Sequence, residues 1–250
     1  MTYWSGQIGP LPAAVSDGAA RTASWLMTSR RGGISQPPFD GWNLAAHVGD
    51  DPAAVAANRQ AVADFAGADT AVFMRQCHSA EVAIVDSSTV TEVVGVDALV
   101  TREPGVVVVA LAADCVPVAL MDVQAGVVAA VHSGWQGMVS DVVGAALSTM
   151  TGLGADVTRI RAVLGPAICG RCYPVPPERV DEAALAVPES RAVAADGQPA
   201  IDVRHGLVAR LERAGVWVET AGGCTAEDPE SFSYRRDGRT GRQGVAVWWN

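Results

Sequence analysis

Six short apolar runs follow one another within about 60 residues, and this density constrains the fold more than any other feature of the sequence. The runs are short and rich in Val, as is typical of buried strands. The segments between them are too short for the helices that connect parallel neighbours. We therefore expect antiparallel or mixed sheets rather than a doubly wound parallel fold. The runs span residues 71–75, 82–85, 98–101, 106–112, 116–121 and 126–131.

Helical periodicity follows and precedes this block. Between residues 136 and 150, apolar side chains recur at intervals of three and four, which predicts an amphipathic helix. Residues 52–65 and 203–214 show weaker periodicity, and acidic residues before the first suit a helix N-terminus. No repeat or linker divides the chain. We expect a single domain over residues 1–250, an α+β sandwich with helices outside the sheets.

Composition excludes several classes of protein. With 250 residues and 49% hydrophobic content, the chain is suited to a folded domain and not to disorder. The longest apolar stretch, residues 105–113, is about half of a membrane span, so we expect no membrane partner. Residues 1–10 have neither a basic start nor a long apolar run. We therefore expect no secretory signal, a cytoplasmic protein and reduced cysteines.

The absence of lysine restricts the chemistry further. All 18 basic residues are arginine, which excludes Schiff-base chemistry and a P-loop. Any bound phosphate must be held by Arg, by backbone N–H groups or by a metal. The net charge of −9 argues against general nucleic-acid binding, which depends on neutralising phosphates. A small-molecule substrate is therefore expected.

His78, Cys115 and His132 are candidates for a metal site. Each lies at the end of an apolar run, and strands of a common sheet can bring such ends together. Two imidazoles and one thiolate form a known catalytic zinc set with a fourth position for water. The alternative is that each residue is a packed or exposed structural side chain. Glycines 134 and 137 after His132 favour the functional reading, because they allow close approach of the backbone to a ligand.

The other cysteines are harder to assign. Cys169 and Cys172 form a C-x-x-C, but a structural zinc site needs a second pair at matching spacing, and a thioredoxin-like site needs a long helix after the pair. Prolines 174, 176 and 177 argue against a helix immediately afterwards. We expect a turn that lines a pocket, with Cys172 as an extra soft metal ligand. Cys77 and Cys224 are expected to have mainly structural roles.

Two polar segments are candidates for substrate binding. Residues 231–242 contain four arginines among aromatic and hydroxyl side chains, which suits either a solvated surface loop or a loop that binds phosphate or sugar. Residues 43–59 are similar in kind, and their polar side chains suit either helix caps or ligand contacts. The candidate residues are Asn43, His47 and Arg59 within residues 43–59, and Arg235, Arg236, Arg239 and Arg242 within residues 231–242.

Five ordered motifs resemble those of the YfiH/PgeF family, also called the DUF152 or laccase-domain family. They are QCHSAEV, ADCVPVAL, VHSGWQGM, GPAICGRCYPV and CTAEDPESFSYRRDGRTGR, and the likeness covers residues 43–247. The resemblance implies layered mixed sheets flanked by helices (α/β/β/α) and a zinc-dependent purine nucleoside phosphorylase that also deaminates adenosine and cleaves methylthioadenosine. It maps the family's metal ligands onto His78, Cys115 and His132. Older assignments in the family are copper polyphenol oxidases, and bacterial members have been linked to peptidoglycan editing.

The expected substrates are thus a nucleoside and phosphate, with Zn²⁺ as cofactor and copper as the alternative metal. Arg171, Pro174 and Gln136 replace the Cys, Glu and Arg usual in the family, which we expect to alter phosphate affinity. The motifs specify no oligomeric state. We expect the substrate to contact Asn43, His47, Arg59, Gln76, Asp114, Cys172, Arg235 and Arg236.

Other functions remain open at the level of sequence. Phosphorolysis of nucleosides is the first expectation and deamination the second. A cysteine hydrolase or amidase acting in peptidoglycan editing would use Cys115 as nucleophile and His132 as base. A multicopper phenol oxidase fits poorly, because such centres use many histidines and this chain has four. A binding module would hold metal without turning over nucleosides.

Overall fold

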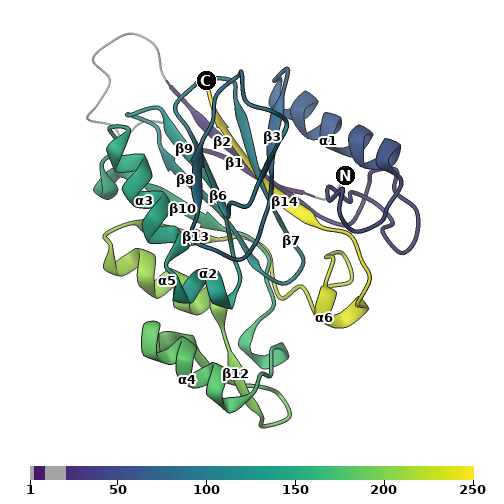
Figure 1. Cartoon of the computed structure of the whole chain (residues 1–250), viewed down its shortest axis with the longest axis vertical. Helices are drawn as coiled ribbons and strands as arrows, with labels where there is room; N and C mark the ends of the chain where they lie inside the picture. Colours follow the sequence, from purple (N-terminus) through teal and green to yellow (C-terminus); the bar gives the residue numbers. More distant parts are fainter. Residues whose placement is uncertain (1–2, 9–20) are drawn as a thin grey trace.

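The computed structural model describes residues 3–8 and 21–250. Residues 1–2 and 9–10, which belong to the N-terminal stretch considered above, lie outside the described residues. Within the described part, two six-stranded sheets stack on each other, with helices on both outer faces (Figure 1). This is the expected single domain of layered mixed sheets flanked by helices.

The first sheet is mixed. Its strands are β1 (Tyr3–Ile8), β2 (Ala23–Thr28), β3 (Ala71–Arg75), β5 (Glu92–Val94), β7 (Val107–Ala112) and β14 (Gln243–Trp249). They lie in the order β1-β2-β14-β7-β3-β5. The first four in this order pair antiparallel, whereas β3 is parallel to both of its neighbours.

The second sheet is also mixed. Its strands are β4 (Val82–Ile84), β6 (Ala98–Thr101), β8 (Val116–Asp122), β9 (Val127–Ser133), β10 (Arg161–Leu164) and β13 (Trp217–Thr220). They lie in the order β13-β10-β8-β9-β6-β4, with parallel pairs at both edges and antiparallel pairs between them. A separate antiparallel pair is formed by β11 (Arg191–Val193) and β12 (Pro199–Ile201).

Alternation along the buried strands builds the layers. In β8, Ala119 and Met121 pack into the core between the two sheets, whereas Val118 and Leu120 pack into the core under the helices. In β7, Val108 lies in the core between the sheets, whereas Val107 and Val109 pack into the core on the outer face of the first sheet. Because both faces of these strands are covered, their sequences read as continuous apolar runs.

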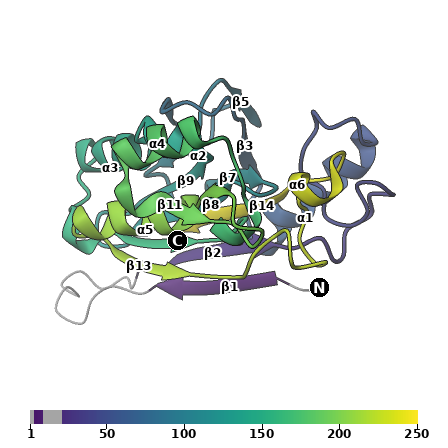
Figure 2. The ribbon, with the colours of Figure 1, turned by 90° about the horizontal axis from the view of Figure 1, so that it is seen from below.

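Helices cover the outer faces of both sheets. α1 (Pro52–Ala66) packs on the first sheet, and four helices lie on the side of the second, as Figures 1 and 2 show. A short helix, α6 (Tyr234–Asp237), precedes β14. No helix among residues 3–8 and 21–250 is long and apolar enough to cross a membrane. Of the four helices on the side of the second sheet, α2 (Trp135–Val139), α3 (Val142–Gly152) and α5 (Val203–Arg213) contact its strands, whereas α4 (Pro177–Ala186) packs against α2 and the β11–β12 pair.

One prediction about helices needs correction. The single helix predicted over residues 136–150 is broken into α2 and α3, because Asp141 adopts φ +63° and its side chain caps α3 by accepting from the Gly144 N–H. The C-x-x-C itself forms a single 3-10 turn, Gly170–Cys172, and no helix follows it immediately, as predicted; α4 begins five residues after Cys172, at Pro177. A proline is compatible with the first helical position, where no intrahelical bond from its nitrogen is needed.

Candidate metal centre

His78, Cys115 and His132 meet where the two sheets adjoin. Their nitrogen and sulfur ligand atoms all lie within 4.8 Å of one another, and His78 Nε2 is 3.7 Å from Cys115 Sγ. The two imidazole rings pack edge to face, with centroids 4.9 Å apart. The predicted grouping of the three residues is therefore found in the structure.

The expectation that strands of one sheet supply these residues is wrong. His78 follows β3 of the first sheet, and His132 lies in β9 of the second. Cys115 lies where the chain leaves β7 in the first sheet and enters β8 in the second. The cluster is thus assembled across the boundary between the sheets, which the pattern of apolar runs does not reveal.

The buried carboxylate of Asp97, at the start of β6, organises two of these residues. It accepts hydrogen bonds from His132 Nδ1 at 2.8 Å and from the backbone N–H groups of His78 at 3.0 Å and Ser79 at 2.7 Å. These bonds hold His78 at φ +62°, which side-chain-bearing residues seldom adopt. Because Asp97 occupies Nδ1 of His132, Nε2 is the ring nitrogen left for a metal.

Gly134 leaves the space that the cluster needs. A Cβ at this position would lie 3.0 Å from Cys115 Sγ and 3.0 Å from His78 Cδ2. A methyl group there would therefore press on two of the three candidate ligands. Steric contacts therefore explain why a glycine stands at this position, where the chain leaves β9.

The charges within the cluster favour a cation. Burial disfavours the thiolate of Cys115, but the charge of His132 and hydrogen bonds from both histidines lower the pKa of Cys115 to about 6. Burial likewise disfavours the charged form of His132, yet the Cys115 thiolate and the Asp97 carboxylate raise the pKa of His132 to about 9. Despite its burial, Asp97 has a pKa below its usual range, because it accepts from His132 and Ser79.

The donor set fits a divalent transition metal. Two imidazole nitrogens and a thiolate, with one histidine oriented by a carboxylate, match three-ligand zinc sites that keep an open position. The same donor types also suit copper.

Two cavities meet at Cys115. One has a volume of about 280 Å³ and the other about 210 Å³, and both are bordered by Ala113, Cys115 and Tyr234. The larger has a polar wall formed by His47, Gln76 and Arg242 beside the cluster. The smaller has an aromatic and apolar wall; its further lining residues are Asp114, Gly134, Trp135, Ile168, Tyr173, Val203 and Arg235.

Four of the predicted substrate contacts border these cavities. His47 and Gln76 line the larger cavity, and Asp114 and Arg235 line the smaller one. Burial and the charge of nearby Arg242 lower the pKa of His47. The Gln76 side chain donates to the carbonyl of Leu111.

Asp114 anchors the segment that lies beside Cys115. At φ +95°, its carboxylate accepts from Thr225 Oγ1 at 2.6 Å, Ser233 Oγ at 2.7 Å and the Arg235 N–H at 2.6 Å. These bonds fix α6, and with it Tyr234, at the mouth of both cavities.

Asn43 and Arg59 line neither of these two cavities. The buried Asn43 side chain donates to Asp50 at 2.8 Å and accepts from the N–H groups of Ala45 and Arg242. Arg59 pairs with Glu92 at 2.9 Å, donates to the Leu44 carbonyl and stacks on Phe73, with its guanidinium carbon 4.2 Å from the ring centroid. Both therefore hold the loop before α1.

Arg236 and Cys172 also lie outside the linings. Arg236 donates to the carbonyls of Thr225, Asp228 and Ser231 and pairs with Asp237, so its guanidinium supports the loop that carries it. Cys172 belongs to a second cluster of side chains, with Cys169, Cys224 and Glu227.

Arg242 has a guanidinium suited to an anion. Among the described residues it forms no ion pair, and Nη1 donates to the carbonyls of Thr240 and Gly241. Burial lowers the pKa of Arg242. Arg235 likewise forms no ion pair within the described part of the chain, and its guanidinium carbon lies 4.8 Å from the Tyr173 ring centroid.

Sequence reasoning did not identify Asp97, Tyr173, Tyr234 or Trp135 as site residues. The only signal for Asp97 was an acidic residue directly before an apolar run, where a strand begins. The aromatic residues gave no signal of their own, because their place at the cavities depends on loops that are distant in sequence.

A third cavity lies elsewhere. It has a volume of about 330 Å³, lies between α1 and β3, and is lined mainly by small and apolar side chains without His or Cys. Arg59 borders it, but Glu92 already neutralises this arginine. The chemistry therefore points to the smaller cavities beside the cluster.

Comparison with known proteins finds similar sequences over most of the chain. The sequence model of a family described as multi-copper polyphenol oxidoreductase laccase matches residues 24–250. A purine nucleoside phosphorylase of Mycobacterium tuberculosis is 46% identical over 226 residues, which cover 89% of this chain and 90% of that protein. One from Streptomyces coelicolor is 48% identical over 230 residues, covering 90% of this chain and 95% of the relative.

Two solved structures share the fold of this chain. A DUF152 protein of Neisseria meningitidis superposes with a TM-score of 0.82 at 30% identity, covering 97% of this chain and 98% of that one. YfiH of Bacillus licheniformis superposes with a TM-score of 0.82 at 27% identity, covering 91% of this chain and 92% of the other.

Proposed function

The chain belongs to the laccase-like DUF152/YfiH family, and from this premise we propose that it is a zinc-dependent purine nucleoside phosphorylase. The observation that carries the proposal is the position of the His78, Cys115 and His132 cluster between a polar cavity and an aromatic one. Such a reaction needs phosphate, ribose and base to be held side by side. A cytoplasmic location stays a prediction from the sequence.

The three residues of the cluster would hold Zn²⁺, with His132 bound through Nε2 and oriented by Asp97. A bound ion would supply positive charge beside the two cavities that Cys115 borders. Copper is the alternative occupant.

Phosphate would bind in the polar cavity. Arg242 has no carboxylate partner among the described residues and borders this cavity together with His47 and Gln76. Its guanidinium can form two parallel hydrogen bonds to phosphate oxygens. In phosphorolysis a phosphate oxygen forms a bond to ribose C1′ as the bond from C1′ to the purine nitrogen breaks. Arg242 would hold the phosphate in position for this attack and stabilise its charge.

The purine would bind in the aromatic cavity. Trp135 and Tyr173 offer ring faces and edges there, and Ile168 adds apolar surface. Stacking on aromatic side chains suits a planar base. Ribose would then lie between the cavities, beside Cys115 and Tyr234, which border both. Deamination of adenosine is proposed as a side activity of the same centre.

A cysteine hydrolase or amidase is the second candidate. The specific observation in its favour is the lowered pKa of Cys115, about 6, beside a His132 whose pKa is raised to about 9. Such a pair resembles an activated nucleophile and its base. This candidate requires no metal, and its cellular substrate would be an amide such as one in peptidoglycan precursors.

One experiment separates these activities. Purified protein is analysed for metal content and incubated with adenosine or inosine, with and without phosphate. The proposal expects zinc in the protein, and free base with ribose 1-phosphate only when phosphate is present. Inosine formed from adenosine would reveal deamination. Metal-free protein that is inactive on nucleosides but cleaves amides would overturn the proposal in favour of the hydrolase.

A further inference from the structure

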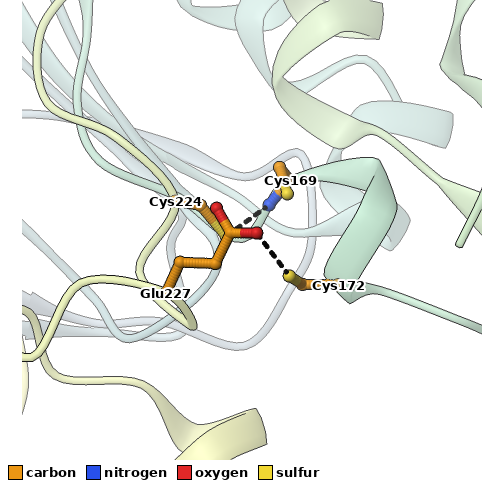
Figure 3. Close-up of side chains that lie close together, drawn as sticks. All are labelled: Cys169, Cys172, Cys224 and Glu227. Atoms are coloured by element: carbon orange, nitrogen blue, oxygen red, sulfur yellow. Dashed lines mark hydrogen bonds between the residues drawn. The ribbon is translucent and has the colours of Figure 1, made fainter. Parts of the chain in front are cut away.

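A second group of metal-ligand side chains lies apart from the first. Cys169, Cys172, Cys224 and Glu227 converge from two loops, and their sulfur and oxygen atoms all lie within 4.8 Å of one another (Figure 3). All three cysteines are free thiols. We propose that this cluster binds a structural Zn²⁺, distinct from the candidate ion held by His78, Cys115 and His132.

Both loops supply their ligands with the same spacing. Cys169 and Cys172 flank one tight turn, in which the Cys172 N–H donates to the Cys169 carbonyl at 3.0 Å. Cys224 and Glu227 flank another, in which the Glu227 N–H donates to the Cys224 carbonyl at 3.2 Å. The second pair that sequence reasoning required is therefore present, as C-x-x-E instead of C-x-x-C. Paired ligands three residues apart on two turns are typical of structural zinc sites.

The backbone holds the two turns together without the ion. Ala167 and Cys224 form a parallel bridge, in which the Thr225 N–H donates to the Ala167 carbonyl at 3.1 Å. The Cys169 N–H donates to Cys224 Sγ at 3.3 Å, and the Cys172 thiol lies 3.5 Å from a Glu227 oxygen. Figure 3 shows these two contacts joining the loops. The backbone therefore already positions the four ligand side chains, and small side-chain movements would bring them to zinc-binding distances.

The donor set suits zinc better than a harder cation. Zn–S bonds of about 2.3 Å place the sulfurs of a tetrahedral site about 3.8 Å apart. Thiolates select zinc over Mg²⁺ or Ca²⁺, which prefer oxygen. A disulfide would use two of the three sulfurs and leave the third sulfur and Glu227 without a role. Two arginines from different helices support the loop that carries Cys224: Arg204 in α5 donates to the Gly222 carbonyl, and Arg236 in α6 donates to the Thr225 carbonyl.

The proposed site would fix one wall of the substrate cavities. Thr225, directly after Cys224, donates to Asp114 at 2.6 Å, and Asp114 precedes Cys115. Tyr173, directly after Cys172, lines the aromatic cavity. An ion that clamps the two turns would therefore hold both Tyr173 and the Asp114 anchor in place. This role is structural and does not depend on which reaction the enzyme performs.

The test is metal stoichiometry of the purified full-length protein, measured by elemental analysis beside protein concentration. We expect two zinc ions per chain in the wild type. Cys172→Ser and the double variant Cys169→Ser/Cys224→Ser should each lose one, and Cys115→Ser should lose the other. Cys77→Ser is the control for the second cluster: Cys77 belongs to neither cluster, although its thiol lies 3.4 Å from Asp97 beside the first, and this variant should keep the ion held by Cys169, Cys172 and Cys224.

This inference can be tested separately from the proposed function, because each cluster loses its ion in a different variant. If the His78, Cys115 and His132 cluster bound no metal, the wild type would hold one ion and Cys172→Ser none, and the inference would stand. Glu227→Gln, which keeps size and exposure, should release zinc to a chelator at least tenfold faster than the wild type. Equal metal content in wild type and Cys172→Ser, or a disulfide among these cysteines in intact-mass and thiol measurements of freshly purified protein, would overturn the inference.

Discussion

Asp97 accepts a hydrogen bond from His132 Nδ1 at 2.8 Å; its fully buried carboxylate lies just before β6, and His132 lies in the neighbouring strand β9. The same carboxylate fixes the backbone of His78, which follows a strand of the other sheet. One acidic side chain therefore orients two candidate ligands at once. Removing its charge is expected to disturb the metal centre more than removing any other residue that does not touch the metal.

The first prediction concerns Asp97→Asn. We expect zinc affinity at the first cluster to fall about 10- to 100-fold, because the amide orients His132 less well and cannot accept from every donor that Asp97 serves. Competition with a coloured chelator measures this affinity. Asp86→Asn, at an exposed turn, is the control and should bind zinc as the wild type does. Unchanged affinity in Asp97→Asn would contradict the orienting role.

The second prediction concerns Cys115→Ser. As a metal ligand, Cys115 supplies a thiolate that is not consumed, and a serine hydroxyl is a poor replacement near neutral pH. We expect the variant to lose zinc from the first cluster and nucleoside turnover together, with partial recovery in excess zinc. A covalent adduct on Cys115, detected by mass spectrometry in active, metal-free wild-type protein, would instead support the hydrolase.

The third prediction concerns phosphate. Arg242→Gln should raise the KM for phosphate roughly 10- to 100-fold, as expected for the loss of a charged hydrogen bond worth about 1.5–3 kcal/mol. Arg239→Gln, in the same loop but bonded to the Gly49 carbonyl, should leave this KM near the wild-type value. Steady-state kinetics at saturating inosine distinguish the two. Arg235→Gln is the second candidate, and normal phosphate kinetics in both Arg242→Gln and Arg235→Gln would refute the assignment of phosphate to arginine.

The fourth prediction concerns pH. In metal-free protein the pKa of Cys115 is lowered to about 6, so its thiolate persists at pH 7 and is lost as the pH falls through about 6. The rate of alkylation at Cys115, followed by peptide mass spectrometry, should therefore have its midpoint near pH 6. A midpoint near the ordinary value of 9.0 would show that the thiol is not activated. Loading with zinc should protect Cys115 at every pH above the midpoint.

The fifth prediction concerns Gly134→Ala. The added methyl would lie 3.0 Å from Cys115 Sγ and from a carbon of His78, so it should lower metal occupancy at the first cluster by pushing the ligands apart. Gly152→Ala, where a methyl meets nothing within 4 Å, is the matched control. Metal analysis of both proteins, purified in parallel, checks the comparison; equal occupancy would mean that the cluster tolerates the crowding.

The central strands could be predicted because they are buried on both faces. All six Val-rich runs are strands, with bounds that differ from the prediction by two residues or fewer. The strand Gln243–Trp249 was missed although it is apolar, because it lies after a long polar loop and far from the block of runs. Its pairing with β2 and β7 is a long-range contact that local patterns do not encode.

The candidate site was predictable only in part. Residue chemistry pointed to His78, Cys115 and His132, but not to Asp97, whose role depends on a strand pairing between β6 and β9. The predicted helix over residues 136–150 was broken by Asp141, since periodicity does not report a left-handed residue between two helices. Glu227 was not predicted as a partner of the cysteines, because only a second cysteine pair was expected to complete a zinc site.

The position of Cys115 between the sheets has a consequence for the order of assembly. β7 and β8 belong to different sheets, and His78 and His132 belong to one sheet each, so a half-formed chain with a single sheet holds at most two of the three ligands. A zinc ion at this cluster would therefore be bound by all three ligands only after the two layers have docked. As a result, free zinc at about 100 times its dissociation constant would stabilise the docked state by about 2.7 kcal/mol. The concentration of free zinc would then affect the stability of the two docked sheets as well as the activity of the enzyme.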